Sequence, residues 1–104
     1  MDIQAISWEQ TIALRQSVLW PTKPPEYCHV EGDHKALHFG VFVNGSLVCV
    51  ASVYLQAGKA RLRKFATQAD YQNQGIGSQM IDFIISSLKE TDVKVFWCDA
   101  RESA

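Results

Sequence analysis

The arrangement of apolar and polar positions along the chain predicts five strands and two helices. Residues 2–6 alternate polar and apolar side chains, which is typical of a short strand at a sheet edge. Ser7 and Gln10 have the spacing of a capping box, and they predict a helix that ends before Pro21. The apolar side of this helix consists of Trp8, Ile12, Leu14, Val18 and Leu19.

Two longer apolar runs form the centre of the predicted sheet. Residues 37–43 and 47–55 are rich in β-branched and aromatic side chains, and Asn44-Gly45 between them is a strong hairpin signal. Both runs are apolar on both faces, which predicts that helices cover both sides of the sheet. A turn at residues 57–59 then leads into a fourth strand.

In the fourth strand, simple alternation of side chains assigns each residue to a face. One face carries Arg61, Arg63, Phe65 and Thr67, and the other carries Leu62, Lys64 and Ala66. Cationic residues therefore lie on both faces near the start of the strand, and one of the two faces either borders a cleft or places its charges in solvent.

The second helix is predicted at about residues 74–88. Its apolar stripe consists of Ile76, Met80, Ile81, Ile84, Ile85 and Leu88. Residues 93–98 form a last strand, which runs parallel to the fourth because a helix connects the two. The sequence therefore predicts an α/β (α+β) fold, with one domain over residues 1–104 and a mixed five-stranded sheet between helices.

The polar turn before the second helix has the composition of an anion site. Gly75 and Gly77 let backbone N–H groups converge, and the first helical turn adds further unpaired N–H groups. A Walker loop is excluded because no lysine follows Gly77, and a dinucleotide fingerprint is weak because Met80 stands at the third glycine position. A glycine-softened helix start without a ligand is the alternative.

Residues 72–77 match the pattern Gln/Arg-x-x-Gly-x-Gly/Ala, and at this point the chain resembles the GNAT superfamily of N-acetyltransferases. Residues 62–67 resemble the family's fourth strand, and residues 97–101 resemble the end of its fifth. The resemblance runs from the first strand to the fifth. It implies that the chain lacks the last helix and the final two strands of the family domain.

The resemblance implies that acetyl-CoA is the donor substrate. In the family the fourth and fifth strands splay apart, the pantetheine arm pairs with the backbone of the fourth, and the glycine-bearing turn holds the pyrophosphate. A backbone N–H group polarises the thioester carbonyl, as in an oxyanion hole. The residues implied to bind acetyl-CoA are Phe65, Ala66, Thr67, Gln72, Asn73, Gln74, Gly75, Ile76, Gly77 and Ser78.

The sequence does not identify the catalytic residues. Transfer needs a neutral amine and a group that protonates the departing thiolate. The family often uses a tyrosine after the fifth strand, but no tyrosine of this chain corresponds to it, and Asp99 stands where many relatives have asparagine. Substitutes by residue type alone are Tyr54, Tyr71, His38 and Cys98, each of which also has a purely structural interpretation.

The long loop after Pro21 is a second region of interest. It carries two further prolines, mixed charges and two histidines, without a helical or strand period. In the family the equivalent segment forms part of the acceptor side of the cleft. Asp33 and His34 are therefore candidates for contacts with the acceptor, and the alternative is that both belong to an exposed surface.

Two functions remain open at this stage. The first is an acetyl-CoA-dependent N-acetyltransferase that acts on the primary amine of a small molecule or of an N-terminus. The second is a catalytically incomplete module that binds CoA or serves in assembly. The aromatic-rich last strand, with no following segment to cover it, also predicts a homodimer or higher oligomer.

Composition narrows the range of partners. Ten basic and eleven acidic residues give a net charge of -1, so the chain has no general field to attract nucleic acid or an anionic membrane. No apolar run approaches the length that a bilayer requires, which argues against a membrane partner. Cys28, Cys49 and Cys98 lack metal-binding spacing, so we expect no metal and a reducing, cytoplasmic setting.

Overall fold

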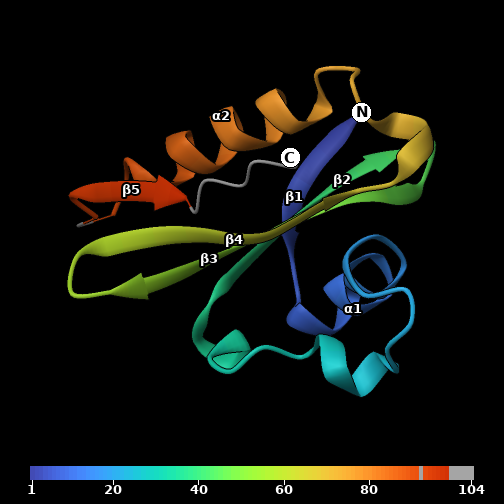
Figure 1. The fold of residues 1–104 in the computed structure, drawn as a ribbon. Helices are drawn as coiled ribbons and strands as arrows, with labels where there is room; N and C mark the ends of the chain where they lie inside the picture. The colour runs from blue at the N-terminus through green and yellow to red at the C-terminus, as the bar shows by residue number, and fades with distance from the viewer. Residues whose placement is uncertain (92, 99–104) are drawn as a thin grey trace.

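The computed structural model describes residues 1–91 and 93–98, which form one mixed sheet with helical segments on both faces (Figure 1). Helix α2 (Ile76–Leu88) covers one face, and short helical segments of the N-terminal half cover the other. The strands are β1 (Asp2–Ile6), β2 (Leu37–Val43), β3 (Ser46–Gln56), β4 (Lys59–Thr67) and β5 (Val95–Cys98). The predicted α+β fold with a five-stranded sheet is confirmed.

The first predicted helix is present, but it is irregular. It is made of η1 (Trp8–Thr11), α1 (Ile12–Leu14) and η2 (Arg15–Leu19), which have 3₁₀, α and π hydrogen bonding in turn. Ser7 N–H donates to Gln10 Oε1 at 2.9 Å, as the capping spacing predicts. The following loop, which has no helical period in the sequence, contains two short helical turns, η3 (Pro25–Cys28) and η4 (Asp33–Lys35).

The sheet has the strand order β1-β2-β3-β4-β5, with β1 at one edge. Neighbouring strands are antiparallel except β4 and β5, which are parallel and pair from Lys59↔Val95 to Leu62↔Cys98. Asn44 and Gly45 have φ values of 52° and 81°, the type I′ geometry that matches the twist of a hairpin. The predicted hairpin and the predicted parallel strand are therefore confirmed.

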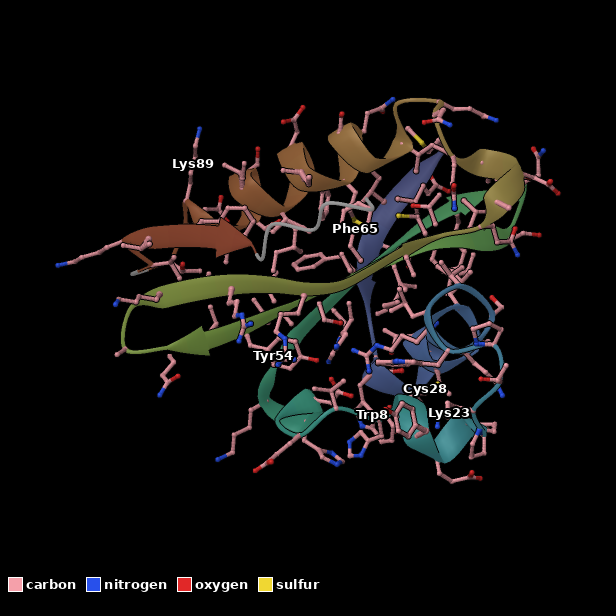
Figure 2. The ribbon with its side chains drawn as sticks, in the orientation of Figure 1. Trp8, Lys23, Cys28, Tyr54, Phe65 and Lys89 are labelled. Atoms are coloured by element: carbon pink, nitrogen blue, oxygen red, sulfur yellow. The ribbon has the colours of Figure 1, made fainter. Side chains whose placement is uncertain are left out.

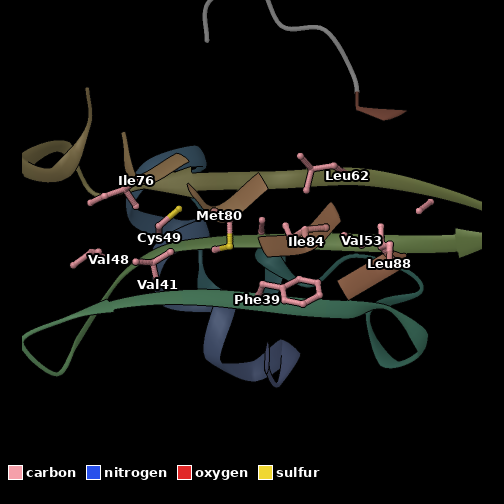
Figure 3. Packing of buried hydrophobic residues seen from close by; sticks show 12 residues of the cluster. Phe39, Val41, Val48, Cys49, Val53, Leu62, Ile76, Met80, Ile84 and Leu88 are labelled. Atoms are coloured by element: carbon pink, nitrogen blue, oxygen red, sulfur yellow. The ribbon is translucent and has the colours of Figure 1, made fainter. Parts of the chain in front are cut away.

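The main core lies between α2 and the sheet (Figure 3). Ile76, Met80, Ile84 and Leu88 of the predicted stripe are buried, while Ile81 and Ile85 are half-buried. The strands contribute Phe39, Val41, Val48, Cys49, Ala51, Val53, Ala60 and Leu62. Met80 is fully buried among these residues, as expected of a side chain that fills the core.

A smaller cluster lies on the opposite face of the sheet. Leu14, Val50 and Ala66 form its centre. Trp8 and Ile12, which the sequence placed on the apolar side of the first helix, are half-buried and are not among the residues of this cluster. The Trp8 ring instead stacks on His29, with 4.4 Å between ring centroids.

A β-bulge interrupts β4 at Lys64. Ser52 pairs with Arg63 and Val50 pairs with Ala66, so Ala51 faces two residues of β4. Lys64 has φ 55°, a left-handed conformation that costs about 1 kcal/mol for a residue with a side chain. Because of the extra residue, the side chains that follow it point to the opposite faces from those that regular alternation would give. Leu62 and Phe65 both pack on the α2 side, and Ala66 packs on the other side. Simple alternation was therefore wrong after Arg63.

Gly40 provides a test of the packing on the smaller face. A Cβ atom there would lie 2.6 Å from Leu47 Cδ1 and 3.1 Å from Ile6 Cδ1. We expect Gly40→Val to lower the free energy of unfolding by about 1–3 kcal/mol, because a β-branched side chain overpacks this site. Urea denaturation measures the change. As a control, Gln4→Ala changes the exposed residue of β1 that pairs with Gly40, and it should change the free energy of unfolding by no more than about 0.5 kcal/mol. Equal effects of the two substitutions would contradict the packing described here.

Candidate functional site

The start of α2 is shaped by a glycine. Gly75 is the N-cap with φ 80°, and Asn73 before it has φ 62°. Apart from its neighbours along the chain, no atom of the described residues lies within 4 Å of the place where a Gly75 Cβ would be, and Gly75 itself is exposed. The first N–H groups of the 13-residue helix have no partner within the helix and carry the positive end of its dipole. This end of α2 can accept an anion.

Side-chain amides fasten the turn before α2 to the end of β4. Gln72 Nε2 donates to the Thr67 carbonyl at 2.9 Å, and Gln74 Nε2 donates to the Asp70 carbonyl at 2.9 Å. A Cβ on Gly77 would lie 3.3 Å from Phe65 Cζ, so the helix approaches β4 closely at this point. The two segments that the sequence assigned to acetyl-CoA binding, residues 65–67 and 72–78, therefore lie side by side.

The far half of β4 extends beyond its described pairing with β5. The last pair between described residues of the two strands is Leu62↔Cys98, whereas β4 continues to Thr67. Gln68 N–H donates to the Val48 carbonyl, so strand alternation turns the backbone groups of Ala66 toward β3 as well. The backbone groups of Phe65 and Thr67 then point to the opposite edge of β4, on the side of β5.

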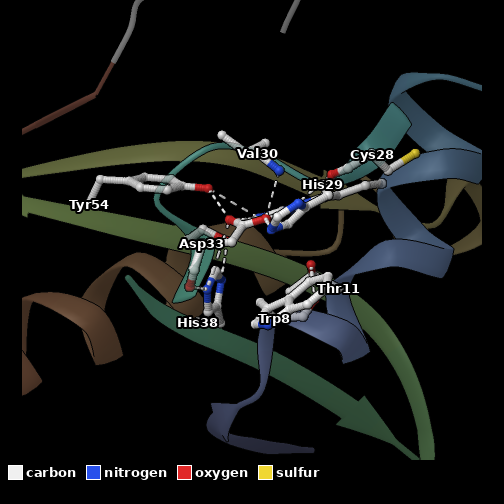
Figure 4. Close-up of polar contacts among 10 residues, drawn as sticks. Trp8, Thr11, Cys28, His29, Val30, Asp33, His38 and Tyr54 are labelled. Atoms are coloured by element: carbon white, nitrogen blue, oxygen red, sulfur yellow. Dashed lines mark hydrogen bonds and ion pairs between the residues drawn. The ribbon is translucent and has the colours of Figure 1, made fainter. Parts of the chain in front are cut away.

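On the opposite face of the sheet, Arg15 and Asp33 form a fully buried ion pair (Figure 4). Arg15 Nη1 donates to Asp33 Oδ2 at 2.7 Å and to the Cys28 carbonyl at 3.0 Å. Arg15 Nη2 donates to Asp33 Oδ1 at 3.1 Å and to Ser52 Oγ at 2.9 Å. The guanidinium therefore joins the first helix, the loop and β3.

Tyr54 and Val30 complete the environment of Asp33. The Tyr54 hydroxyl donates to Asp33 Oδ1 at 2.5 Å, and Val30 N–H donates to Oδ2 at 2.8 Å. Burial alone would raise the pKa of Asp33, but the hydrogen bonds from Arg15, Tyr54 and Val30 outweigh it and lower the pKa to about 2. Burial and the bond to Asp33 raise the pKa of Tyr54 to about 12. Asp33 is thus an anion and Tyr54 a neutral phenol at pH 7.

The structure places the two loop candidates, Asp33 and His34, in different environments. Asp33 is not the exposed surface residue that the sequence suggested: only 1% of it is accessible, because η4 turns it inward onto Arg15. His34 is exposed, with its ring centroid 5.2 Å from that of Trp8. Sequence analysis missed Arg15, although Thr11 and Val18 on either side of it in the helix period could have indicated an inward position.

The candidates chosen by residue type have structural roles where they are described. His38 is buried, with Nδ1 2.7 Å from Ser52 Oγ and Nε2 2.9 Å from the Asp33 carbonyl oxygen. Tyr71 is half-buried and packs against the main core. Burial raises the pKa of the Cys28 and Cys49 thiols, so both stay protonated. The side chain of Cys98, and Asp99, lie outside the described residues.

The described residues contain no cluster of metal-ligand side chains. Within residues 1–91 and 93–98, no three His, Cys, Asp or Glu side chains are grouped as a metal ion would need. No helix in that part of the chain has the length and apolar character to cross a membrane.

Comparisons with known proteins relate the chain to one family of acetyltransferases. The sequence model of the Acetyltransferase (GNAT) family matches residues 2–104. The chain is 34% identical to the uncharacterized N-acetyltransferase YitI of Bacillus subtilis (strain 168) over 110 residues, which cover 97% of this chain and 74% of YitI. It is 30% identical to the [ribosomal protein bS18]-alanine N-acetyltransferase of Escherichia coli (strain K12) over 67 residues, which are 64% of this chain and 45% of that protein.

A solved structure shares the fold. The ribosomal-protein-alanine N-acetyltransferase from Brucella melitensis biovar Abortus 2308 superposes with a TM-score of 0.81 at 20% identity. The superposition covers 98% of this chain and 82% of that one.

The ion pair can be tested by removing one partner. We expect Arg15→Met to lower the free energy of unfolding by about 3–5 kcal/mol, because it leaves Asp33 buried without its counter-charge. The double variant Arg15→Met/Asp33→Leu should lose much less than the sum of the two single changes. Chemical denaturation of the three variants measures this coupling. Lys35→Met, an exposed cation nearby, serves as the control, and additive effects in the double variant would contradict the pair's role.

The lowered pKa of Asp33 predicts a loss of stability in acid. Unfolded Asp33 has a pKa near 3.8 and folded Asp33 a pKa of about 2, so between these values the unfolded state binds the proton and the folded state does not. As pH falls from about 5 to 2, we expect this group alone to remove about 2 kcal/mol of stability. Denaturation curves over this range, compared with those of Asp33→Asn, isolate the contribution. Parallel profiles for the two proteins would disprove it.

Proposed function

Because the chain belongs to the GNAT family of acetyltransferases, we propose that it transfers an acetyl group from acetyl-CoA to a primary amine, on a small molecule or an N-terminus. The observation that carries this proposal is the edge of β4 beyond its last described pair with β5, which lies beside the glycine-capped start of α2. An extended ligand with phosphates at one end fits such a junction, because it needs both a strand partner and an anion site.

The residues around this junction suit acetyl-CoA. The pyrophosphate would lie against the N–H groups of residues 75–78, where Gly75 leaves the backbone bare. The amides of the pantetheine arm would pair with the outward backbone groups of Phe65 and Thr67, as an added strand does. Gln72, whose amide already bonds the Thr67 carbonyl, holds the turn in the position that makes both contacts possible.

Acetyl-CoA supplies an acyl group activated as a thioester. In the transfer, the C–N bond to the acceptor forms, the C–S bond breaks, and the proton that leaves the amine balances the CoA thiolate. The described residues contribute little to moving this proton, since Asp33 is held as an anion by Arg15 and Tyr54 stays protonated.

The lack of a free acid or base among the described residues favours a second candidate, a module that binds CoA without turnover. None of the acid or base candidates within residues 1–91 and 93–98 is both unengaged and next to the part of β4 that extends beyond Leu62. One experiment distinguishes the two functions. Calorimetry with acetyl-CoA measures binding, and a thiol-release assay with mixed amines measures transfer; binding without thiol release would favour the module.

Self-association and a cytoplasmic location stay predictions from the sequence. Light scattering coupled to gel filtration at micromolar concentration tests the first: a monomer of 11.7 kDa would disprove it.

A substitution at Gly75 tests the donor site. We expect Gly75→Asp to weaken acetyl-CoA binding about tenfold or more relative to Gly75→Asn, because only the aspartate places a negative charge beside the phosphates. Asparagine is the matched control, since both residues carry a side chain of similar size into the same left-handed backbone. Calorimetry on folded variants gives both affinities, and equal values would remove the pyrophosphate from this site.

A further inference from the structure

Arg63 occupies a particular place on β4. It is the first residue beyond Leu62↔Cys98, the last pair with β5, and it immediately precedes the bulge at Lys64. It pairs with Ser52, whose hydroxyl bonds Arg15, so its side chain lies on the sheet face opposite α2. Phe65 lies on the α2 side of the strand and Tyr54 on the other (Figure 2).

The Arg63 guanidinium is held by an aromatic ring rather than by a carboxylate. Its Cζ lies 5.5 Å from the centroid of Tyr54, a cation–π contact. Tyr54 is itself fixed by its bond to Asp33. Within the described residues the ion pairs of Asp33 involve Arg15, His29 and His38, and Arg63 takes part in none. Its positive charge is thus oriented without being neutralised by a described residue.

A second cation lies next to it. Lys64 Nζ is 4.9 Å from the centroid of the Trp20 ring, at the end of the first helix, so it is also on the face opposite α2. Asp33, the buried acid of this face, is already compensated by Arg15. Among the described residues, the buried acid of this face therefore leaves the charge of Arg63 unneutralised.

From this geometry we propose that Arg63 selects acceptors that carry a carboxylate close to the amine, such as amino acids or an N-terminus followed by an acidic residue. The inference rests on the proposed function, which puts the donor's phosphates at α2 and its thioester where the strands separate. The acceptor must then approach from the opposite face, where Arg63 lies. A guanidinium can bind a carboxylate through two parallel hydrogen bonds and fix the amine relative to the strand.

The test uses pairs of acceptors that differ only in the carboxylate. Calorimetry with the CoA-saturated protein compares glycine with glycinamide and β-alanine with β-alaninamide; a separate arm compares short peptides that have Asp or Asn as the second residue. CoA itself cannot react, so binding is measured whether or not the protein turns over. We expect each acid to bind at least tenfold more tightly than its amide in one of the two arms, and the arm identifies the source of the carboxylate.

Arg63→Gln should abolish this preference while leaving the affinity for CoA within about twofold. The control Lys59→Gln removes an exposed positive charge at the start of the same strand and should keep the preference. Native protein that binds acids and amides equally would overturn the proposal, as would Arg63→Gln protein that keeps the preference.

The outcomes also distinguish a failure of this inference from a failure of the proposed function on which it rests. If CoA fails to bind, the proposed function and the acceptor inference both fall. If CoA binds and the acids show no advantage in either arm, only the role of Arg63 is lost. A matching loss of kcat/KM for acids, but not for amides, in the thiol-release assay of Arg63→Gln would add kinetic support.

Discussion

The buried ion pair of Arg15 and Asp33 is the constraint on which one whole side of the molecule depends. Taking a guanidinium and a carboxylate out of water costs several kcal/mol for each ion, and their attraction offsets this only with good geometry and further hydrogen bonds. Here the Cys28 carbonyl, Ser52, Tyr54 and Val30 supply those bonds. The loop of residues 20–36 contributes little to the apolar clusters, so its place over the sheet is set mainly by this network.

The bulge at Lys64 determines which side chains of β4 lie on each face of the sheet. By inserting one residue, it directs Phe65 toward α2 while Arg63 stays on the opposite face. A regular strand would have put both side chains on one face. The strand therefore carries an apolar side chain on one face and a cationic side chain on the other at nearly the same point. This division suits a reaction in which two substrates meet from opposite sides.

Much of the fold could be predicted because it follows from local pattern. The hairpin depends on Asn44-Gly45, where both residues adopt positive φ, and helix α2 depends on a stripe with a clear 3.6-residue period. The parallel pairing of the last strand follows from the helix between it and β4. The glycine-bearing turn at residues 72–77 could likewise be recognised from spacing alone, although its ligand stays a proposal.

The parts that could not be predicted depend on contacts between distant residues. A bulge leaves no mark in the sequence of β4, because Lys64 is not a residue that favours a left-handed backbone. Asp33 is a polar residue in a proline-rich loop, and only its partner Arg15, 18 positions earlier in the chain, makes its burial possible. Rules based on single residues assign such a side chain to the surface.

The same network has a consequence for the order in which the chain folds. The contacts of Arg15 reach 18 residues to Asp33, 37 to Ser52 and 39 to Tyr54, so they close long loops. Arg15 gains nothing by leaving water until β3 and η4 are both in place, whereas the β2–β3 hairpin can form from neighbouring residues. We therefore expect the N-terminal helix and its loop to dock last and to open first. The face opposite α2 would then be the kinetically labile side of the protein, while α2 packs on strands that assemble early.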